Sequence, residues 1–306
     1  MNLIGAFLKL IRWPNLLFIA LTQFLLYYCI YLPIYNADPD YSKLGWLVIA
    51  SVFIAAAGYI INDYFDLNID QVNKPEKNVV DKVIHRRWAI LWHFFLSALG
   101  VLATIIAVGF SKWYLVLANV MVVILLWFYS TSFKRQLLIG NIVISLLTAW
   151  TVLILFFVYT DLSNAFAASN DLSKKFFRTA FLYGGFAFIL SLVREAIKDM
   201  EDLEGDARYG CKTLPIVAGI QTTKVYVAVW LIVLIGALIV LQLYVLQLHW
   251  WQAVLYSSLF VIFPLVYILY RLFKAENSKQ FHLLSTASKL VMFTGILSMI
   301  FFRFYF

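Results

Sequence analysis

Residues 44–70 read LGWLVIASVFIAAAGYIINDYFDLNID, an apolar run that ends in a series of aspartates. A helix needs about 20 apolar residues to cross the hydrocarbon core of a bilayer, and this run has that length. Asp63, Asp66 and Asp70 follow at i, i+3 and i+7. This spacing places three carboxylates on one face of a helix. The stretch therefore predicts a membrane-spanning helix with an acidic patch at one end.

The composition of the whole chain agrees with this prediction. Of its 306 residues, 63% are hydrophobic and 13% are charged, whereas soluble domains are about half apolar and about a quarter charged. No apolar run alternates at period two, so helices rather than a barrel are expected to span the bilayer. We predict an all-α, polytopic membrane bundle that forms a single domain over residues 1–306. The nine spans are expected at roughly 15–35, 44–62, 89–109, 113–130, 138–159, 178–196, 224–247, 251–271 and 285–305.

A second acidic set follows the sixth of these runs. Asp199, Asp202 and Asp206 repeat the i, i+3, i+7 spacing of the first set. Each member lies 136 residues after its counterpart (199−63, 202−66 and 206−70). Repetition at one fixed offset, at the same place relative to the spans, predicts an internal duplication. We expect two four-helix units followed by a ninth helix.

The two acidic sets predict a metal site. Carboxylates crowded on one face repel one another unless a divalent cation lies between them. Mg²⁺ prefers oxygen ligands and is often shared between one or two carboxylates and the phosphates of a substrate. The alternative is a solvated acidic helix end, which the cost of carboxylates at membrane depth disfavours. We therefore predict Mg²⁺ as cofactor and a diphosphate as substrate, with the metal ligands Asp63, Asp66, Asp70, Asp199, Asp202 and Asp206.

Basic residues near the acids are candidates to bind the oxygens of the diphosphate. They are Arg12, Lys74, Lys134, Arg135 and Lys198. For each of them the alternative is a purely topological role, because Lys and Arg collect on one side of a membrane in any case. Tyr129 lies beside this group in the sequence, and its ring is suited to contact a carbocation.

The distribution of charge between the loops predicts the orientation. If the N-terminus is inside, 18 of the 24 Lys and Arg residues fall on that side. By the positive-inside rule this side is cytoplasmic. Of the 16 acidic residues, 12 are on the same side. Because acidic residues contribute little to topology, their excess on this side indicates a functional role. We expect a multi-pass protein of the plasma membrane, with its N-terminus and acidic loops in the cytoplasm and no nucleic-acid partner.

These motifs resemble those of the UbiA-type intramembrane prenyltransferases. The first motif of that family, N-D-x-x-D-x-x-x-D, is matched in full by residues 62–70, and the second, D-x-x-D-x-x-x-D, by residues 199–206. Arg12-Trp13-Pro14-Asn15 is similar to the Arg-Pro-Asn region before the first span of the family. Residues 129–135, with Gly140-Asn141, resemble its Tyr-Ser-…-Lys-Arg-…-Gly-Asn stretch.

The resemblance implies an activity, namely Mg²⁺-dependent transfer of a prenyl group from an allylic diphosphate to an acceptor at the membrane. It implies catalytic roles for Asp66, Asp70, Asp202, Asp206 and Lys134. It implies substrate-binding roles for Arg12, Asn15, Asn62, Lys74, Tyr129, Arg135, Asn141 and Lys198.

The acceptor is less closely defined by the sequence. Residues 194–216 resemble most the branch that acts on geranylgeranylglyceryl phosphate, in ether lipid synthesis. Ala55 stands where the hydroxybenzoate branch usually has an arginine. A departure at residues 76–80 from the pattern of the lipid branch leaves an aromatic acceptor of quinone synthesis as an alternative. A membrane cation transporter is the alternative of another class, but its acids should be spread near the midplane rather than gathered at one end.

Overall fold

The computed structural model describes residues 3–73, 80, 83–161 and 171–305, and these form a bundle of helices. Two short helices, α1 (Leu3–Leu10) and α2 (Trp13–Leu25), open the chain, and a π-helical stretch connects α2 to α3 (Leu32–Tyr35). The long helices are α4 (Tyr41–Asn73), α5 (Arg86–Val108), α6 (Trp113–Thr131), α7 (Ile139–Tyr159), α9 (Asp171–Glu201) and α12 (Ile220–Gln247). The rest are α10 (Leu203–Arg208), α11 (Leu214–Val217), α13 (Trp251–Ser257), α14 (Phe263–Lys274), α15 (Ser278–Leu297) and α16 (Phe302–Tyr305).

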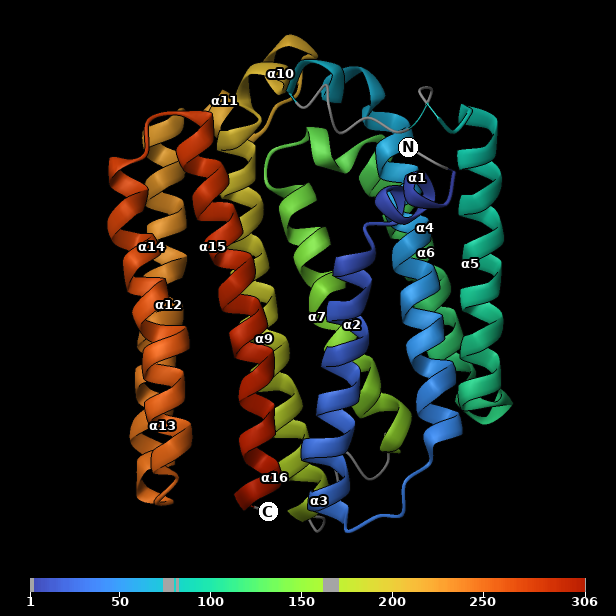
Figure 1. Cartoon of the computed structure of the whole chain (residues 1–306), viewed down its shortest axis with the longest axis vertical. Helices are drawn as coiled ribbons and strands as arrows, with labels where there is room; N and C mark the ends of the chain where they lie inside the picture. The colour runs from blue at the N-terminus through green and yellow to red at the C-terminus, as the bar shows by residue number, and fades with distance from the viewer. Residues whose placement is uncertain (1–2, 74–79, 81–82, 162–170, 306) are drawn as a thin grey trace.

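Nine segments of the described chain are long and apolar enough to cross a membrane. They match the nine predicted spans in order and position, and the prediction of an all-helical membrane bundle is confirmed. The predicted duplication of a four-helix unit stays a prediction. The two ends of the chain lie at opposite ends of the bundle, as an odd number of crossings requires (Figure 1).

The two helices that carry the acidic sets extend beyond the predicted membrane spans. Helix α4 has 33 residues and α9 has 31, and at about 1.5 Å per residue each is much longer than the hydrocarbon core is thick. The predicted spans end at residues 62 and 196 because an apolar run ends where the membrane ends, whereas backbone hydrogen bonding continues to Asn73 in α4 and Glu201 in α9. The extra turns carry the aspartates beyond the apolar part of the bundle.

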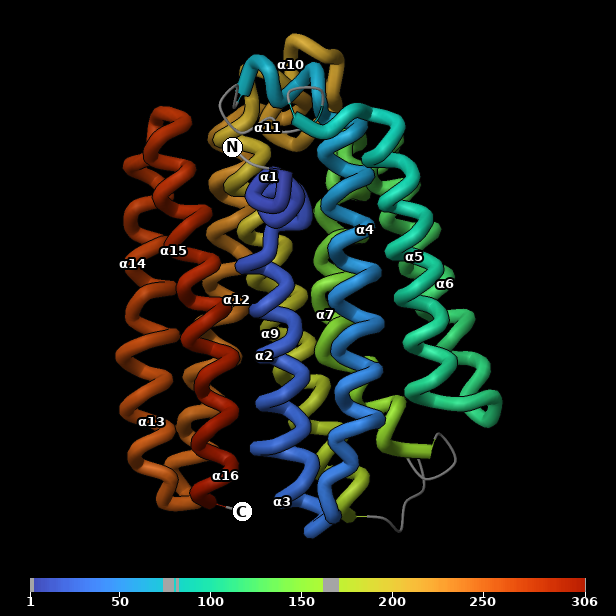
Figure 2. The backbone as a smooth tube through the Cα atoms, turned by 45° about the vertical axis from the view of Figure 1, so that its right-hand side comes forward, coloured from blue at the N-terminus to red at the C-terminus, as the bar shows by residue number. Residues whose placement is uncertain are grey.

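The helices form two edges and a centre. Helices α12 to α14 make one edge, α5 and α6 make the other, and α2, α7 and α9 lie between them in both views (Figures 1 and 2). Helix α4 packs against α5, and α9 packs against α7 and α15. The C-terminal end of α4, together with α10 and α11, caps one end of the bundle (Figure 1).

The outer helices expose apolar side chains. In the most apolar stretch of α12 only 11% of the residues are buried, and large side chains such as Val240 and Leu243 are exposed. A contiguous apolar surface of this kind is unfavourable in water and is the surface that lipid covers. The structure is therefore that of a multi-pass membrane protein.

Close packing of α4 against α5 depends on Gly100. A Cβ at this position would lie 2.6 Å from Ile54 Cγ1 and 3.2 Å from the carbonyl oxygen of Ala50. We expect Gly100→Ala to lower the free energy of unfolding by roughly 1–3 kcal/mol, because the overpacked helices must separate. The measurement is the Tm of the purified protein in detergent. Gly236→Ala on α12 is the matched control, since a Cβ there meets no atom within 4 Å; equal Tm values for the two variants would contradict this explanation.

Candidate active site

The two acidic sets lie at the same end of the bundle. Asp63, Asp66 and Asp70 are on the last turns of α4. Asp199 is on the last turn of α9, and Asp206 is on α10. Asp202 lies between these two helices, so the second set does not lie on one uninterrupted helix as predicted. The hydrogen bonds from Asp202 N to Lys198 O and from Asp206 N to Asp202 O nevertheless keep the helical i to i−4 pattern across the break.

Asn73 joins the ends of the two acidic helices. Its side-chain amide donates to the carbonyl oxygen of Asp202 at 3.1 Å, and its Oδ1 accepts from Gly205 N at 2.9 Å. A larger residue at 205 would displace the Asn73 side chain, because a Cβ there would lie 2.4 Å from Asn73 Oδ1. Two hydrogen bonds from one side chain to the neighbouring backbone fix the separation of the acidic sets.

Lys134 binds the first acidic set. Its Nζ lies 2.6 Å from Asp66 Oδ1 and donates to Asn62 Oδ1 at 3.2 Å. The Asn62 amide in turn donates to the other oxygen of Asp66. The turn that carries Lys134 lies against Gly140 at the start of α7, where a Cβ would be 2.7 Å from Lys134 Cα. The predicted Lys-Arg and Gly-Asn stretches therefore act together, because the glycine allows the turn with the lysine to approach.

Arg12 lies against the same set from the N-terminal side. Its Nη2 donates to Asp63 Oδ1 at 2.6 Å, and its guanidinium lies 5.1 Å from the centre of the Tyr59 ring. The backbone of Arg12 is left-handed, with φ of 52°, a conformation that costs about 1–3 kcal/mol in a residue other than glycine and that is found often at functional sites. The strained backbone and the short ion pair together direct the guanidinium at the acidic end of α4.

Asn141 and Lys198 accompany the second set. The Asn141 amide donates to Asp199 Oδ2 at 2.8 Å. Lys198 lines the central cavity together with Tyr129, and the charges of Glu195 and Asp202 act on it. By contrast, the side chain of Arg135 is exposed, and the contact it makes here is through its carbonyl oxygen, which accepts from Lys212 N.

The charge at this end is not fully balanced by the protein. Burial, and then the negative charge of Asp202, raises the pKa of Asp206 to about 7. The charge of Asp66 acts in the same direction, which shows that the two acidic sets are close enough to repel each other. Burial also lowers the pKa of Lys134, although Asp66 opposes this shift. A cation bound between the sets would favour the ionised carboxylates.

The donor set fits Mg²⁺ shared with a substrate. In the described ranges, no three His, Cys, Asp or Glu side chains lie close enough together to hold a metal ion by themselves. Mg²⁺ does not require such a cage, because it usually keeps several waters and binds one or two carboxylates together with substrate phosphates. Carboxylates on two facing helices, joined by Asn73, supply that kind of incomplete shell.

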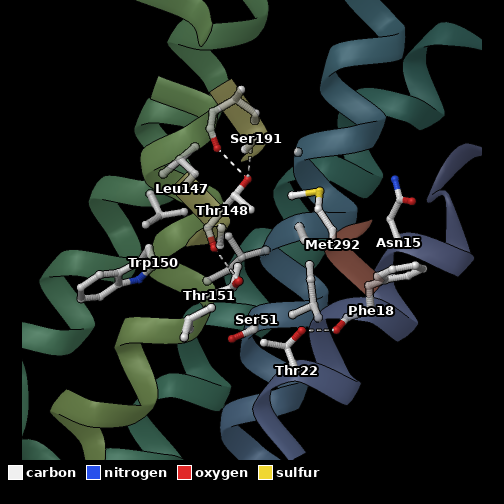
Figure 3. Close-up of a pocket in the computed structure, with 18 of the residues that line it drawn as sticks. Asn15, Phe18, Thr22, Ser51, Leu147, Thr148, Trp150, Thr151, Ser191 and Met292 are labelled. Atoms are coloured by element: carbon white, nitrogen blue, oxygen red, sulfur yellow. Dashed lines mark hydrogen bonds between the residues drawn. The ribbon is translucent and has the colours of Figure 1, made fainter. Parts of the chain in front are cut away.

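A cavity of about 310 Å³ extends from this end into the bundle. Arg12, Asn62 and Lys198 line it near the acidic sets. Farther along, its wall is made mainly of apolar side chains and hydroxyl groups, with Phe18 of α2 on one side and Thr148 and Trp150 of α7 on the other (Figure 3). A space with one charged end and an apolar body suits an isoprenoid diphosphate.

The structure brings together most of the residues that the sequence pointed to. The predicted residues found at this end are Arg12, Asn15, Asn62, Asp63, Asp66, Asp70, Tyr129, Lys134, Asn141, Lys198, Asp199, Asp202 and Asp206. Lys74 lies outside the described residues. Asn73, Arg194, Glu195 and Lys289 also lie at this end and were not among the predicted site residues. The signal for Lys289 was its position inside an apolar span, where an ionisable residue is expected to be functional.

Comparison with known proteins agrees with this geometry. The model of the UbiA prenyltransferase family matches residues 24–297. Digeranylgeranylglyceryl phosphate synthase of Methanothermobacter thermautotrophicus is 36% identical over 199 residues, which are 63% of this chain and 62% of that protein. The match therefore spans less than two thirds of that relative.

Solved structures share the fold. One, described as "Structural and mechanistic insights into the biosynthesis of Digeranylgeranylglyceryl phosphate synthase in membranes", has a TM-score of 0.63 and 23% identity, and the match covers 98% of this chain and 99% of that one. A UbiA homolog from Archaeoglobus fulgidus bound to GPP and Mg²⁺ has a TM-score of 0.56 and 18% identity, over 96% and 99% of the two chains. At these identities the likeness concerns the fold alone. The family match over nearly the whole chain, on a bundle with paired acidic helix ends, shows that the protein belongs to the UbiA prenyltransferase family.

Proposed function

We propose that this chain, acting as one domain over residues 1–306, transfers a prenyl group from an allylic diphosphate to geranylgeranylglyceryl phosphate. One observation carries the proposal: two facing carboxylate sets lie at the charged end of an otherwise apolar cavity. Two relatives support it, since a structural neighbour is bound to GPP and Mg²⁺ and a relative in sequence is named digeranylgeranylglyceryl phosphate synthase. Mg²⁺ bound by the six aspartates would neutralise charge on the leaving diphosphate.

The side chains of the protein promote breakage of the bond between C1 of the prenyl chain and the diphosphate. Lys134 and Arg12 lie within bonding distance of Asp66 and Asp63, and in the complex they also face the diphosphate oxygens. Positive groups fixed where negative charge develops stabilise the transition state. The ring of Tyr129 faces the allylic carbon from the wall of the cavity and stabilises its positive charge. The acceptor oxygen forms the new bond to C1, the diphosphate leaves with the electron pair, and the hydroxyl proton passes to the diphosphate.

The body of the cavity holds the prenyl chain and excludes water. Hydrocarbon side chains such as Leu147, Val152 and Ile296 line it, and these have no group that would react with an allylic cation. Exclusion of water protects the cation until the acceptor attacks. The other predicted contacts, from Asn15, Asn62 and Asn141, position the substrate or the aspartates.

We also propose an orientation for the protein, namely in the plasma membrane with the N-terminus and the acidic end in the cytoplasm. The excess of Lys and Arg on that side, 18 of 24, supports it. Soluble prenyl diphosphates would then reach the site directly from the cytoplasm.

The first test is an acceptor panel. Purified protein is incubated with geranylgeranyl diphosphate, Mg²⁺ and one of three acceptors: geranylgeranylglyceryl phosphate, dihydroxynaphthoate or hydroxybenzoate. We expect kcat/KM to be at least about tenfold higher for the lipid, because a site with polar groups placed for one acceptor rejects others. Turnover should cease in EDTA and return with Mg²⁺. Preference for dihydroxynaphthoate would assign the chain to quinone synthesis, and turnover that resists EDTA would contradict the metal site.

The second test removes single charges from each acidic set. Asp66→Asn and Asp202→Asn keep the size of the side chains, and we expect each to lower kcat by roughly 10²–10³, the usual effect of losing one group that stabilises the transition state. Asp171→Ala is the control, because Asp171 is exposed at the opposite end of α9. Tm values close to that of the wild type would show that both variants are folded. Turnover within about twofold of the wild type in either variant would be incompatible with the proposed role of its set.

A further inference from the structure

The wall of the cavity has more positively charged side chains than those that lie against the two acidic sets. Its charged residues are Arg12, Arg194, Glu195, Lys198 and Lys289, four cations and one anion. Arg12 is paired with Asp63, and the charges of Glu195 and Asp202 act on Lys198. Arg194, which is ion-paired with Glu195, and Lys289 form a second basic group on the same wall.

Lys289 lies on α15 and points at α2. Its Nζ donates to Asn15 Oδ1 at 2.5 Å and lies 5.4 Å from the centre of the Phe18 ring. In the part of the chain that the structure describes, it forms no ion pair with a carboxylate. The charges that act on it most are those of Arg194 and Arg12, both of its own sign. A lysine held among cations on a cavity wall is unfavourable unless an anion binds there.

Arg194 lies on α9, against which α15 packs. Its Nη1 donates to Glu195 Oε1 at 2.5 Å, and its side chain is 28% exposed. A guanidinium has five N–H donors in a planar fork that matches the oxygens of a phosphate or a carboxylate. One ion pair with its neighbour therefore leaves donors for a ligand.

We propose that Lys289 and Arg194, with Asn15 holding the lysine in place, form an anion site for the headgroup of the acceptor, separate from the diphosphate site on the aspartates. The inference rests on the proposed function and adds the residues that recognise the acceptor. Asn15 and Phe18 lie side by side on α2 at this wall, with Met292 of α15 near them (Figure 3).

The chemistry of the pair favours a phosphate monoester. Such a group carries a charge of about −1.5 to −2 at neutral pH, which the two cations can balance, whereas an aromatic acid carries a single charge. In a glycerol phosphate the free hydroxyl lies within a few bonds of the phosphate. A phosphate bound by Lys289 and Arg194, next to Arg12 on the same wall, would therefore bring the hydroxyl close to the allylic carbon.

The test separates the charge of Lys289 from its contact with α2. Lys289→Met removes the charge and the hydrogen bond, Lys289→Gln keeps a donor for Asn15, and Lys289→Arg keeps the charge. Lys279→Met is the matched control, since Lys279 is an exposed lysine on the same helix. For each variant, KM and kcat are measured with geranylgeranylglyceryl phosphate and with geranylgeranylglycerol, which lacks the phosphate, and KM is measured for geranylgeranyl diphosphate.

We expect Lys289→Met and Lys289→Gln to raise KM for the phosphorylated acceptor by roughly 10- to 100-fold, the effect of losing a hydrogen bond to a charged group. KM for geranylgeranyl diphosphate and the kinetics with geranylgeranylglycerol should change by less than about twofold. Lys289→Arg should restore most of the affinity, and Lys279→Met should behave as the wild type.

Two results would overturn the anion site. One is an equal loss with both acceptors, which would make Lys289 a structural contact. The other is an increase in KM for geranylgeranyl diphosphate alone, which would place Lys289 in the diphosphate site. Failure of the proposed acceptor is distinguishable, because the wild type would then prenylate dihydroxynaphthoate and not the lipid. In that case the same variants are compared on dihydroxynaphthoate and on dihydroxynaphthalene; a loss confined to the carboxylate supports the anion site, and an equal loss refutes it.

Discussion

Repulsion among carboxylates at one end of an apolar bundle is the constraint on which the rest of this structure depends. The protein offsets part of that repulsion with Arg12 and Lys134, each within 2.6 Å of an aspartate. Burial, and then the remaining repulsion from Asp202, raises the pKa of Asp206 to about 7. Asn73 prevents the two helix ends from moving apart, through hydrogen bonds to the backbone of the second set. Aspartates that are kept close together despite their mutual repulsion are suited to bind a cation together with an anionic substrate.

The apolar interior of the bundle provides a binding space for the hydrocarbon chain of the substrate. The outer helices place their apolar side chains toward lipid, so the inner helices can enclose a cavity of about 310 Å³. Because the charged residues of the cavity lie near the aspartates, a diphosphate and its hydrocarbon chain can bind in only one direction. The second basic group, Lys289 and Arg194, adds a place for the other reactant at the same end. The fold therefore produces the site by separating a charged end of the bundle from an apolar interior.

Much of this could be predicted from the sequence. Long apolar runs predicted the nine spans, since the length of a crossing is set by the bilayer, and the offset of 136 residues predicted that the acidic sets belong together. The extension of α4 through Asp70 was predicted from the spacing of its aspartates, whereas the break at Asp202 between α9 and α10 was not. The roles of Asn73 and Lys289 depend on partners more than 100 residues away in the sequence. No local pattern indicates such contacts, so only the structure shows them.

Carboxylates of the two acidic sets are proposed to bind one shared metal–diphosphate group. The most direct measurement is anomalous scattering from crystals of the protein with Mn²⁺, which prefers the same oxygen ligands as Mg²⁺, and a non-hydrolysable prenyl diphosphate analogue. The account predicts Mn²⁺ peaks between the first set (Asp63, Asp66, Asp70) and the second (Asp199, Asp202, Asp206), with the diphosphate in contact with the metal and its chain in the cavity. Peaks at only one set, or a diphosphate bound away from both, would contradict it.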